Sequence, residues 1–291
     1  MIQERLKALR AEMEKRGITV YVVPTADFHE SEYVGDHFKA RKFITGFTGS
    51  AGTAVITLDE AGLWTDGRYF VQAENQLKDS TVTLYRMGEE GVPTVDEFVK
   101  DRLKEGGCLG FDGRVVNGTW GGKLEKIAAE KNVSMHVTED LIDLIWEDRP
   151  ALSKQPLFIL EEKYSGKSTA DKIADLRKAM KENGADVHIL TSLYDIAWLL
   201  NIRGNDIDYV PVVLSYLVLN ETECIWFLQE EVVDDTIRAY LKENHIETRP
   251  YDDIYTYVPT IPESAVVLMN KSSVNYRFCS IHSGSSFSAV N

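Results

Sequence analysis

The sequence predicts an α/β fold built from two similar domains in tandem, and three observations predict it. The chain has 291 residues, which is about two domains at roughly 150 residues each. Apolar residues at helical spacing followed by a short apolar run occur near the start and again about 167 residues later. A glycine-containing loop and a strand–turn–strand segment then recur in the same order, which indicates an internal duplication.

The first expected elements are a helix and a strand. Leu6, Leu9 and Met13 recur at helical spacing, and Gly17 stands where such a helix would end. The apolar, β-branched run 18–23 then predicts a strand, which Pro24 would end.

The same two elements are expected in the second half. Ile173, Leu176 and Met180 repeat the helical spacing, and Gly184 stands at the expected end of the helix. Ser168 is a suitable N-cap for this helix, and residues 187–190 predict the strand that follows.

Two further pairs of segments match. Residues 44–50 resemble residues 199–205, and residues 54–64 resemble residues 216–226. The second comparison aligns Trp64 with Trp226 and predicts a strand, a turn and a strand in each half. Each domain is therefore expected to hold a mixed β-sheet flanked by helices.

The prolines and polar residues of 148–156 break the pattern and predict the domain boundary. We therefore expect a first domain over 1–155 and a second over 156–285. Residues 286–291 are expected to be a tail or a cut linker, because the chain from Ser280 on holds five serines and few apolar side chains.

Composition excludes several classes of function. The 32 basic and 46 acidic residues give a net charge of −14, which disfavours binding to nucleic acid or to an anionic membrane surface. No apolar run approaches the roughly 20 residues of a membrane span. Three scattered cysteines argue against a disulfide framework and favour a reducing, cytoplasmic location.

Two segments invite a ligand-binding interpretation. The glycines of 46–52 could cradle a phosphate, but residues 53–57 predict a strand where a helix N-terminus would be needed, so a tight turn is favoured. The His and acidic side chains of 27–37 could hold a divalent ion, but they match no known zinc spacing, so a solvated polar loop is favoured.

The segment 63–70 contains the most distinctive candidate site. Asp66-Gly67 is a turn signal, and it predicts Arg68 and Tyr69 at the tip or mouth of a hairpin. The guanidinium of Arg68 could offer a planar fork of donors to a carboxylate or a carbonyl. The alternative is that Arg68 caps the local turn or pairs with Glu74. The second half has no counterpart of this Asp-Gly-Arg run.

These residues resemble a known family, the Xaa-Pro aminopeptidases (aminopeptidase P), in their long, three-domain cytosolic form. The resemblance extends over about residues 1–270. It rests on these segments: Pro24 with Asp27, His29, Ser31, Glu32 and Tyr33; 46–53; 64–70; 145–150; and 196–206.

The resemblance implies two tandem creatinase N-terminal-like domains, followed in the family by a "pita-bread" catalytic domain. In the family that third domain holds two divalent metal ions, usually manganese, on two Asp, one His and two Glu. No segment of this sequence matches those ligands, so neither catalytic residues nor metal ligands are expected here. The resemblance also implies a homodimer and a peptide substrate with proline at its second position.

The family's substrate-contacting arginine corresponds to Arg68, with His29 and Tyr69 as secondary candidates for the pocket rim. We therefore expect a non-catalytic N-terminal region that narrows the active-site mouth, supports assembly and lacks peptidase activity alone. The alternative is a freestanding binding or regulatory module of the same fold. A creatinase-like amidinohydrolase is disfavoured, since the shorter family members have only one such domain.

Overall fold

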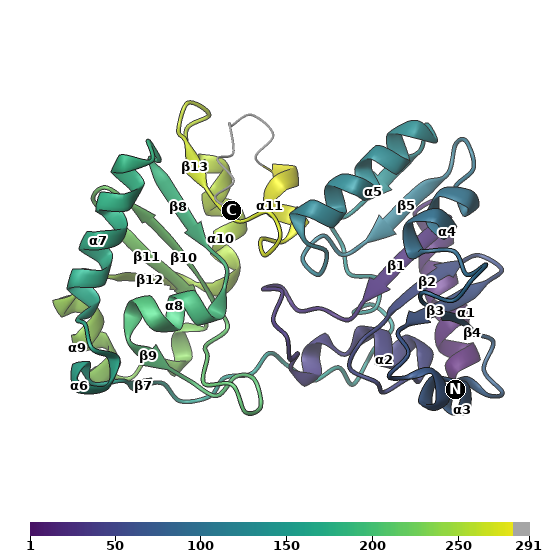
Figure 1. Cartoon of the computed structure of the whole chain (residues 1–291), viewed down its shortest axis with the longest axis horizontal. Coiled ribbons are helices and arrows are strands. Elements are labelled where there is room, and N and C mark those ends of the chain that lie inside the picture. The colour runs from purple at the N-terminus through teal and green to yellow at the C-terminus, as the bar shows by residue number, and fades with distance from the viewer. Residues whose placement is uncertain (282–291) are drawn as a thin grey trace. The chain divides into compact units, whose positions relative to one another are not determined.

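The structure, a computed structural model, describes residues 1–281 and divides into two compact units (Figure 1). Unit 1 comprises residues 1–28 and 36–151, and unit 2 comprises residues 29–35 and the chain from Leu152 on. The sequence contains no sign of the excursion at 29–35, because a segment of seven residues is too short to show a period of its own. The tail expected at 286–291 lies outside the described residues.

Unit 1 is built on a six-stranded sheet with the strand order β4-β3-β2-β1-β5-β6. Neighbours β1–β2 and β2–β3 are antiparallel, whereas β3–β4, β1–β5 and β5–β6 are parallel. The strands are β1 Val20–Pro24, β2 Thr53–Thr57, β3 Ala61–Thr65, β4 Thr83–Arg86, β5 Cys108–Phe111 and β6 Ser134–His136.

Helices flank both faces of this sheet. They are α1 Ile2–Lys15, α2 Ala40–Thr45, α3 Phe70–Leu77, α4 Val95–Arg102 and α5 Gly118–Glu130. Helices α1, α2 and α3 share one apolar core with the sheet, in which Leu6, Ile44 and Ala73 are fully buried. On the other side, the ring of Phe98 in α4 packs edge-on against Trp64 of β3, with centroids 4.8 Å apart.

Unit 2 holds a five-stranded sheet with the order β12-β11-β10-β8-β13, and a small β7-β9 pair. Its strands are β7 Phe158–Ile159, β8 Val187–Leu190, β9 Ile202–Arg203, β10 Ser215–Asn220, β11 Cys224–Leu228, β12 Glu247–Pro250 and β13 Val267–Leu268. Its helices are α6 Glu162–Ser165, α7 Thr169–Glu182, α8 Leu193–Leu200, α9 Asp235–Glu243, α10 Ile254–Tyr257 and α11 Tyr276–Ile281.

The predicted duplication is confirmed by topology. The order β12-β11-β10-β8-β13 repeats β4-β3-β2-β1-β5. The directions also repeat, since β8–β10 and β10–β11 are antiparallel while β8–β13 and β11–β12 are parallel. In each unit a helix, α3 or α9, connects the parallel edge pair.

Matched side-chain and backbone details support the same conclusion. Arg10 Nε donates to the carbonyl of Thr57 over 2.9 Å, and Arg177 Nε donates to the carbonyl of Asn220 over 2.9 Å. Arg10 reaches from α1 to the last residue of β2, and Arg177 reaches from α7 to the last residue of β10. Gly17 and Gly184 follow these helices with φ values of +67° and +65°, a left-handed conformation that favours glycine.

The alignment of Trp64 with Trp226 is wrong by one residue. The turns that close the two hairpins pair Ile56 with Ala61 and Leu219 with Cys224. Counting from these pairs, Trp226 is the counterpart of Leu63. A slip of one residue moves a strand side chain to the other face, so the two tryptophans point to opposite faces of their sheets.

The hairpin predicted around Asp66 is also wrong. The turn exists, because the Tyr69 amide donates to the Asp66 carbonyl over 3.0 Å. It leads from β3 into α3, however, and the next strand, β4, lies parallel to β3. Ala73 and Leu77 bury one face of α3 at helical spacing, which the polar residues around them obscured in the sequence.

Candidate functional site

Arg68 lies in the turn at the carboxyl end of β3, directly before α3. Its guanidinium makes two parallel bonds to Asp66, from Nε to Oδ1 and from Nη2 to Oδ2, each 2.8 Å long. The Arg68 amide also donates to Asp66 Oδ1 over 3.1 Å. The alternative pairing with Glu74 is wrong, because Glu74 accepts from Arg86 over 2.7 Å.

This ion pair is exposed and still has donors to offer. The side chain of Arg68 is 71% accessible. Its hydrogen bonds hold the pKa of Asp66 down to about 2, and the carboxylate raises the pKa of Arg68. A guanidinium has five N–H groups, so the two used on Asp66 leave three that can bind a carbonyl or carboxylate from outside the turn.

Tyr69 connects this turn to the glycine-containing loop. Its hydroxyl lies 2.6 Å from Ser50 Oγ, and its ring packs edge-on against Phe47, with centroids 6.0 Å apart. A Cβ added at Gly49 would lie 2.8 Å from Tyr69 Cδ1, so the loop needs a glycine there for space. The loop runs into strand β2, as expected, and no helix N-terminus follows it.

A row of exposed polar side chains extends the site along α3. Gln72 Nε2 and Gln76 Nε2 donate to Thr48 Oγ1 over 2.9 and 2.8 Å, and Gln76 Oε1 accepts from the Thr48 amide over 2.9 Å. The sequence predicted no role for Gln72, Gln76 or Ser50, because the hairpin expected around Asp66 placed a strand where α3 lies. The structure thus brings Arg68 and Tyr69 together with a polar helix face.

His29, the other secondary candidate, belongs to unit 2 and is only 2% exposed. Its Nδ1 donates to the carbonyl of Thr191 over 3.0 Å. A carbonyl only accepts, so Nδ1 carries a proton, and in a neutral ring Nε2 then accepts from the hydroxyl of Tyr251 at 2.6 Å. These bonds fix both ring nitrogens inside unit 2.

The rest of the polar segment 27–37 contains both buried and exposed side chains. Asp27 is 1% exposed, so the segment is not the uniformly solvated loop that the sequence favoured. Asp36 pairs with Lys39, and His37 Nδ1 bonds the carbonyl of Pro150 over 2.8 Å. Within residues 1–281, no three His, Cys, Asp or Glu side chains are grouped as metal ligands.

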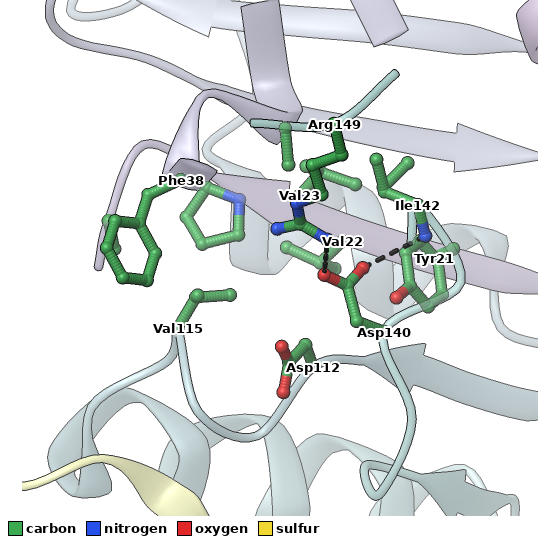
Figure 2. Close-up of a pocket in the computed structure, with 12 residues that line it drawn as sticks. Tyr21, Val22, Val23, Phe38, Asp112, Val115, Asp140, Ile142 and Arg149 are labelled. Carbon is green, nitrogen blue, oxygen red and sulfur yellow. Dashed lines mark hydrogen bonds and ion pairs between the residues drawn. The ribbon is translucent and has the colours of Figure 1, made fainter. Parts of the chain in front are cut away.

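The carboxyl ends of β1 and β5 are where α/β sheets commonly bind ligands, and a pocket lies there. Figure 2 shows Asp140 bonded to Arg149, with Asp112 facing the same space. The Arg149–Asp140 pair is buried and 2.6 Å long, and Asp112 pairs with Arg114 at 3.0 Å. The remaining cavity of about 10 Å³ has room for about one water molecule, so this place is structural.

Comparisons with known proteins agree with this architecture. Residues 5–145 and 148–290 each match a family model described as the Creatinase/Prolidase N-terminal domain. No helix among the described residues has the length and apolar character needed to cross a bilayer.

Similar proteins are longer than this chain. It is 41% identical over 265 residues to a probable Xaa-Pro aminopeptidase P of Sordaria macrospora, covering 90% of this chain and 43% of that protein. It is 36% identical over 288 residues to aminopeptidase P2 of Arabidopsis thaliana, covering 97% and 40%. The chain thus spans about two fifths of these curated relatives.

A solved structure matches the whole chain. The X-prolyl aminopeptidase of Caenorhabditis elegans, described as a cytosolic enzyme with a di-nuclear active site, aligns with a TM-score of 0.93 and 31% identity. The alignment covers 100% of this chain and 50% of that one. The chain therefore belongs to the creatinase/prolidase N-terminal domain family, with two such domains in tandem.

Proposed function

We propose that this chain is the non-catalytic N-terminal region of an Xaa-Pro aminopeptidase, a metallopeptidase that releases the residue before proline. The observation that carries the proposal is the alignment of the entire chain with one half of the worm enzyme at 31% identity. In this proposal the chain shapes substrate access and supports assembly of a homodimer, and the chemistry belongs to the part of the relatives that this chain does not match.

The proposal assigns Arg68 the task of holding the peptide. Its exposed guanidinium is fixed on one edge by Asp66, so little conformational entropy is lost when another edge binds a peptide carbonyl or carboxylate. Such a contact orients the substrate without taking part in bond cleavage. Tyr69 supports it by holding the adjacent loop through Ser50.

In this proposal two divalent ions, with manganese as the expected metal, are bound by the part of the full-length enzyme that corresponds to the half of the worm enzyme outside the alignment. When bound, such ions would supply Lewis-acid activation of water and of the scissile carbonyl. The worm enzyme is described as having a di-nuclear active site and as cytosolic, which supports the metal ions and a cytoplasmic location in this proposal.

The test uses the full-length protein that contains this sequence, with an Xaa-Pro-containing tripeptide and Mn²⁺. Arg68→Gln is expected to raise KM about tenfold, the equivalent of about 1.4 kcal/mol, with kcat nearly unchanged. Arg102→Gln is the matched control, because Arg102 is also a surface arginine paired with a carboxylate, Glu60. Equal KM values for both variants would exclude the role of Arg68.

A further inference from the structure

A groove on unit 1 begins next to the Arg68 turn, since the amide of Met87 in its lining donates over 3.0 Å to the carbonyl of Thr65, the residue before Asp66. It lies beyond the carboxyl end of β4, at the first turns of α4 and α5. Its volume is about 370 Å³, within the range of ligand-binding pockets. Its walls are mostly apolar. They are formed by Thr53, Met87, Gly88, Val92, Pro93, Thr94, Val95, Asp96 and Trp120.

The groove is held open by hydrogen bonds in its walls. Trp64 Nε1 donates to the carbonyl of Pro93 over 2.8 Å and anchors the turn that forms one wall. Trp120 Nε1 donates to Asp96 Oδ1 over 2.8 Å and fixes the indole beside the carboxylate. Met87 is 50% exposed, so its flexible side chain is available to a ligand.

The charge of the groove is acidic. Asp96 is the one charged side chain in its lining, and among the described residues no donor bonds its Oδ2. Glu90 is exposed on the turn that leads from Met87 to Val92, whereas Glu89 on the same turn pairs with Arg86 at 3.7 Å. An indole face next to a carboxylate suits a cationic group on an apolar stem, above all a guanidinium.

The duplication shows what the same region does in unit 2. Thr53 pairs with Trp64 as Tyr216 pairs with Phe227, and Met87 and Tyr251 each follow the edge strand directly. Trp120 and Phe278 each stand three residues after an asparagine that precedes the helix. The matched pairs are Thr53 and Tyr216, Met87 and Tyr251, and Trp120 and Phe278.

In unit 2 these counterparts form an aromatic cluster that holds a side chain from a distant segment. Tyr216 stacks on Tyr251 with centroids 5.1 Å apart, and Phe278 packs edge-on to Tyr216 at 5.4 Å. His29, from segment 29–35, lies 4.5 Å from the Tyr216 ring and bonds the Tyr251 hydroxyl. In unit 2 this region therefore receives the imidazole ring of His29. In unit 1, Thr53 and Met87 stand in place of the two tyrosines, and the groove is open.

We propose that the unit 1 groove binds an extended peptide segment of another polypeptide and takes up one arginine side chain. The guanidinium stacks on Trp120 and bonds Asp96, and the aliphatic stem covers Met87 and Val92. This inference is independent of the proposed aminopeptidase role.

The test measures fluorescence anisotropy of labelled Gly-Ala-Arg-Ala-Gly as the protein is titrated. A second probe carries citrulline, which has the shape of arginine without its charge. The unchanged chain is expected to bind the arginine probe at least tenfold more tightly than the citrulline probe, and to lose most of this difference in 0.5 M salt.

Asp96→Asn keeps an acceptor for Trp120 and removes the charge, so it is expected to reduce the difference between probes to less than about twofold. Asp101→Asn is the control, because Asp101 lies on α4 outside the groove and is 67% exposed. The proposal is overturned if the two probes bind alike, if neither binds at millimolar protein, or if Asp101→Asn acts like Asp96→Asn. It is also overturned if sedimentation shows a dimer that Asp96→Asn dissociates, since the groove would then serve a second copy.

Discussion

The ammonium of Lys172 lies 4.4 Å from the centroid of the Trp198 ring and donates to the carbonyl of the same residue over 2.7 Å. The other unit repeats this relationship. The guanidinium of Arg5 lies 4.0 Å from the Phe43 ring and donates to the Phe43 carbonyl over 2.7 Å. In both domains, therefore, a cation from the first long helix contacts one aromatic residue of the next helix twice, at the ring and at the backbone carbonyl.

This relationship predicts that Lys172 stabilises unit 2. Lys172 is 1% exposed and also donates to Asn201 Oδ1 over 2.7 Å, and burial lowers its pKa. Lys172→Met leaves the buried Asn201 Oδ1 and the partly buried Trp198 carbonyl without this donor, so urea denaturation should show a loss of about 1–3 kcal/mol. Lys178→Met, on the exposed side of the same helix, should change stability by less than about 0.5 kcal/mol. Equal losses in the two variants would contradict the assignment.

The glycine-containing loops predict a second stability difference. A Cβ at Gly49 would overlap Phe47 and Tyr69, and one at Gly204 would lie 2.9 Å from Val213 Cγ2. Each Gly→Ala change should cost about 1–3 kcal/mol by overpacking. Gly122→Ala in α5 is the control, because a Cβ there meets nothing within 4 Å and should add about 0.5–1 kcal/mol. The loops are not tightly packed if Gly49→Ala is as stable as Gly122→Ala.

The Arg68–Asp66 pair predicts a pH dependence. The pKa of Asp66 is about 2 in the folded chain, below the ordinary 3.8, because Arg68 bonds the charged form. A depressed carboxyl pKa means that the pair's contribution to stability is present above about pH 4 and is lost as the pH falls through about 2. Carbon-13 NMR of the Asp66 carboxyl should show this midpoint, and Arg68→Gln should move it towards 3.8. An unchanged midpoint in Arg68→Gln would show that the pair does not form in solution.

His29 predicts an effect confined to unit 2. His29→Ala removes the bonds to Thr191 and Tyr251 and the ring packed against Tyr216. Hydrogen exchange should therefore quicken in β8, β10 and segment 29–35, by about 30-fold if about 2 kcal/mol is lost. Exchange in β2 and β3 of unit 1 should stay as it was. Uniform quickening in both units would mean that His29 does not dock as the structure describes.

The sequence predicted the duplication because helix spacing and glycine stops survive in both halves, as Leu6 to Gly17 and Ile173 to Gly184 show. The sequence could not show whether Trp226 matches Trp64 or Leu63. Adjacent strand residues point to opposite faces, but both candidates are apolar, so their polarity does not distinguish the two alignments. The correct alignment depends on which residues pair across each hairpin, Ile56 with Ala61 and Leu219 with Cys224, and the structure shows this pairing.

The candidate site was predicted only in part. The Asp66-Gly67 turn and the exposure of Arg68 followed from local chemistry, whereas the polar row on α3 depends on a helix that the sequence did not reveal. His29 was a secondary candidate for the pocket rim on the family resemblance alone, and such a resemblance does not say which unit encloses a residue. Its burial in unit 2 depends on Thr191 and Tyr251, which are 162 and 222 residues away.

The most direct test of the central proposal is peptidase activity of the full-length protein compared with that of residues 1–291. Release of the first residue from an Xaa-Pro tripeptide is measured for both, with Mn²⁺ present. We expect release by the full-length protein and none by residues 1–291. Release by residues 1–291 alone, or none by the full-length protein, would contradict it.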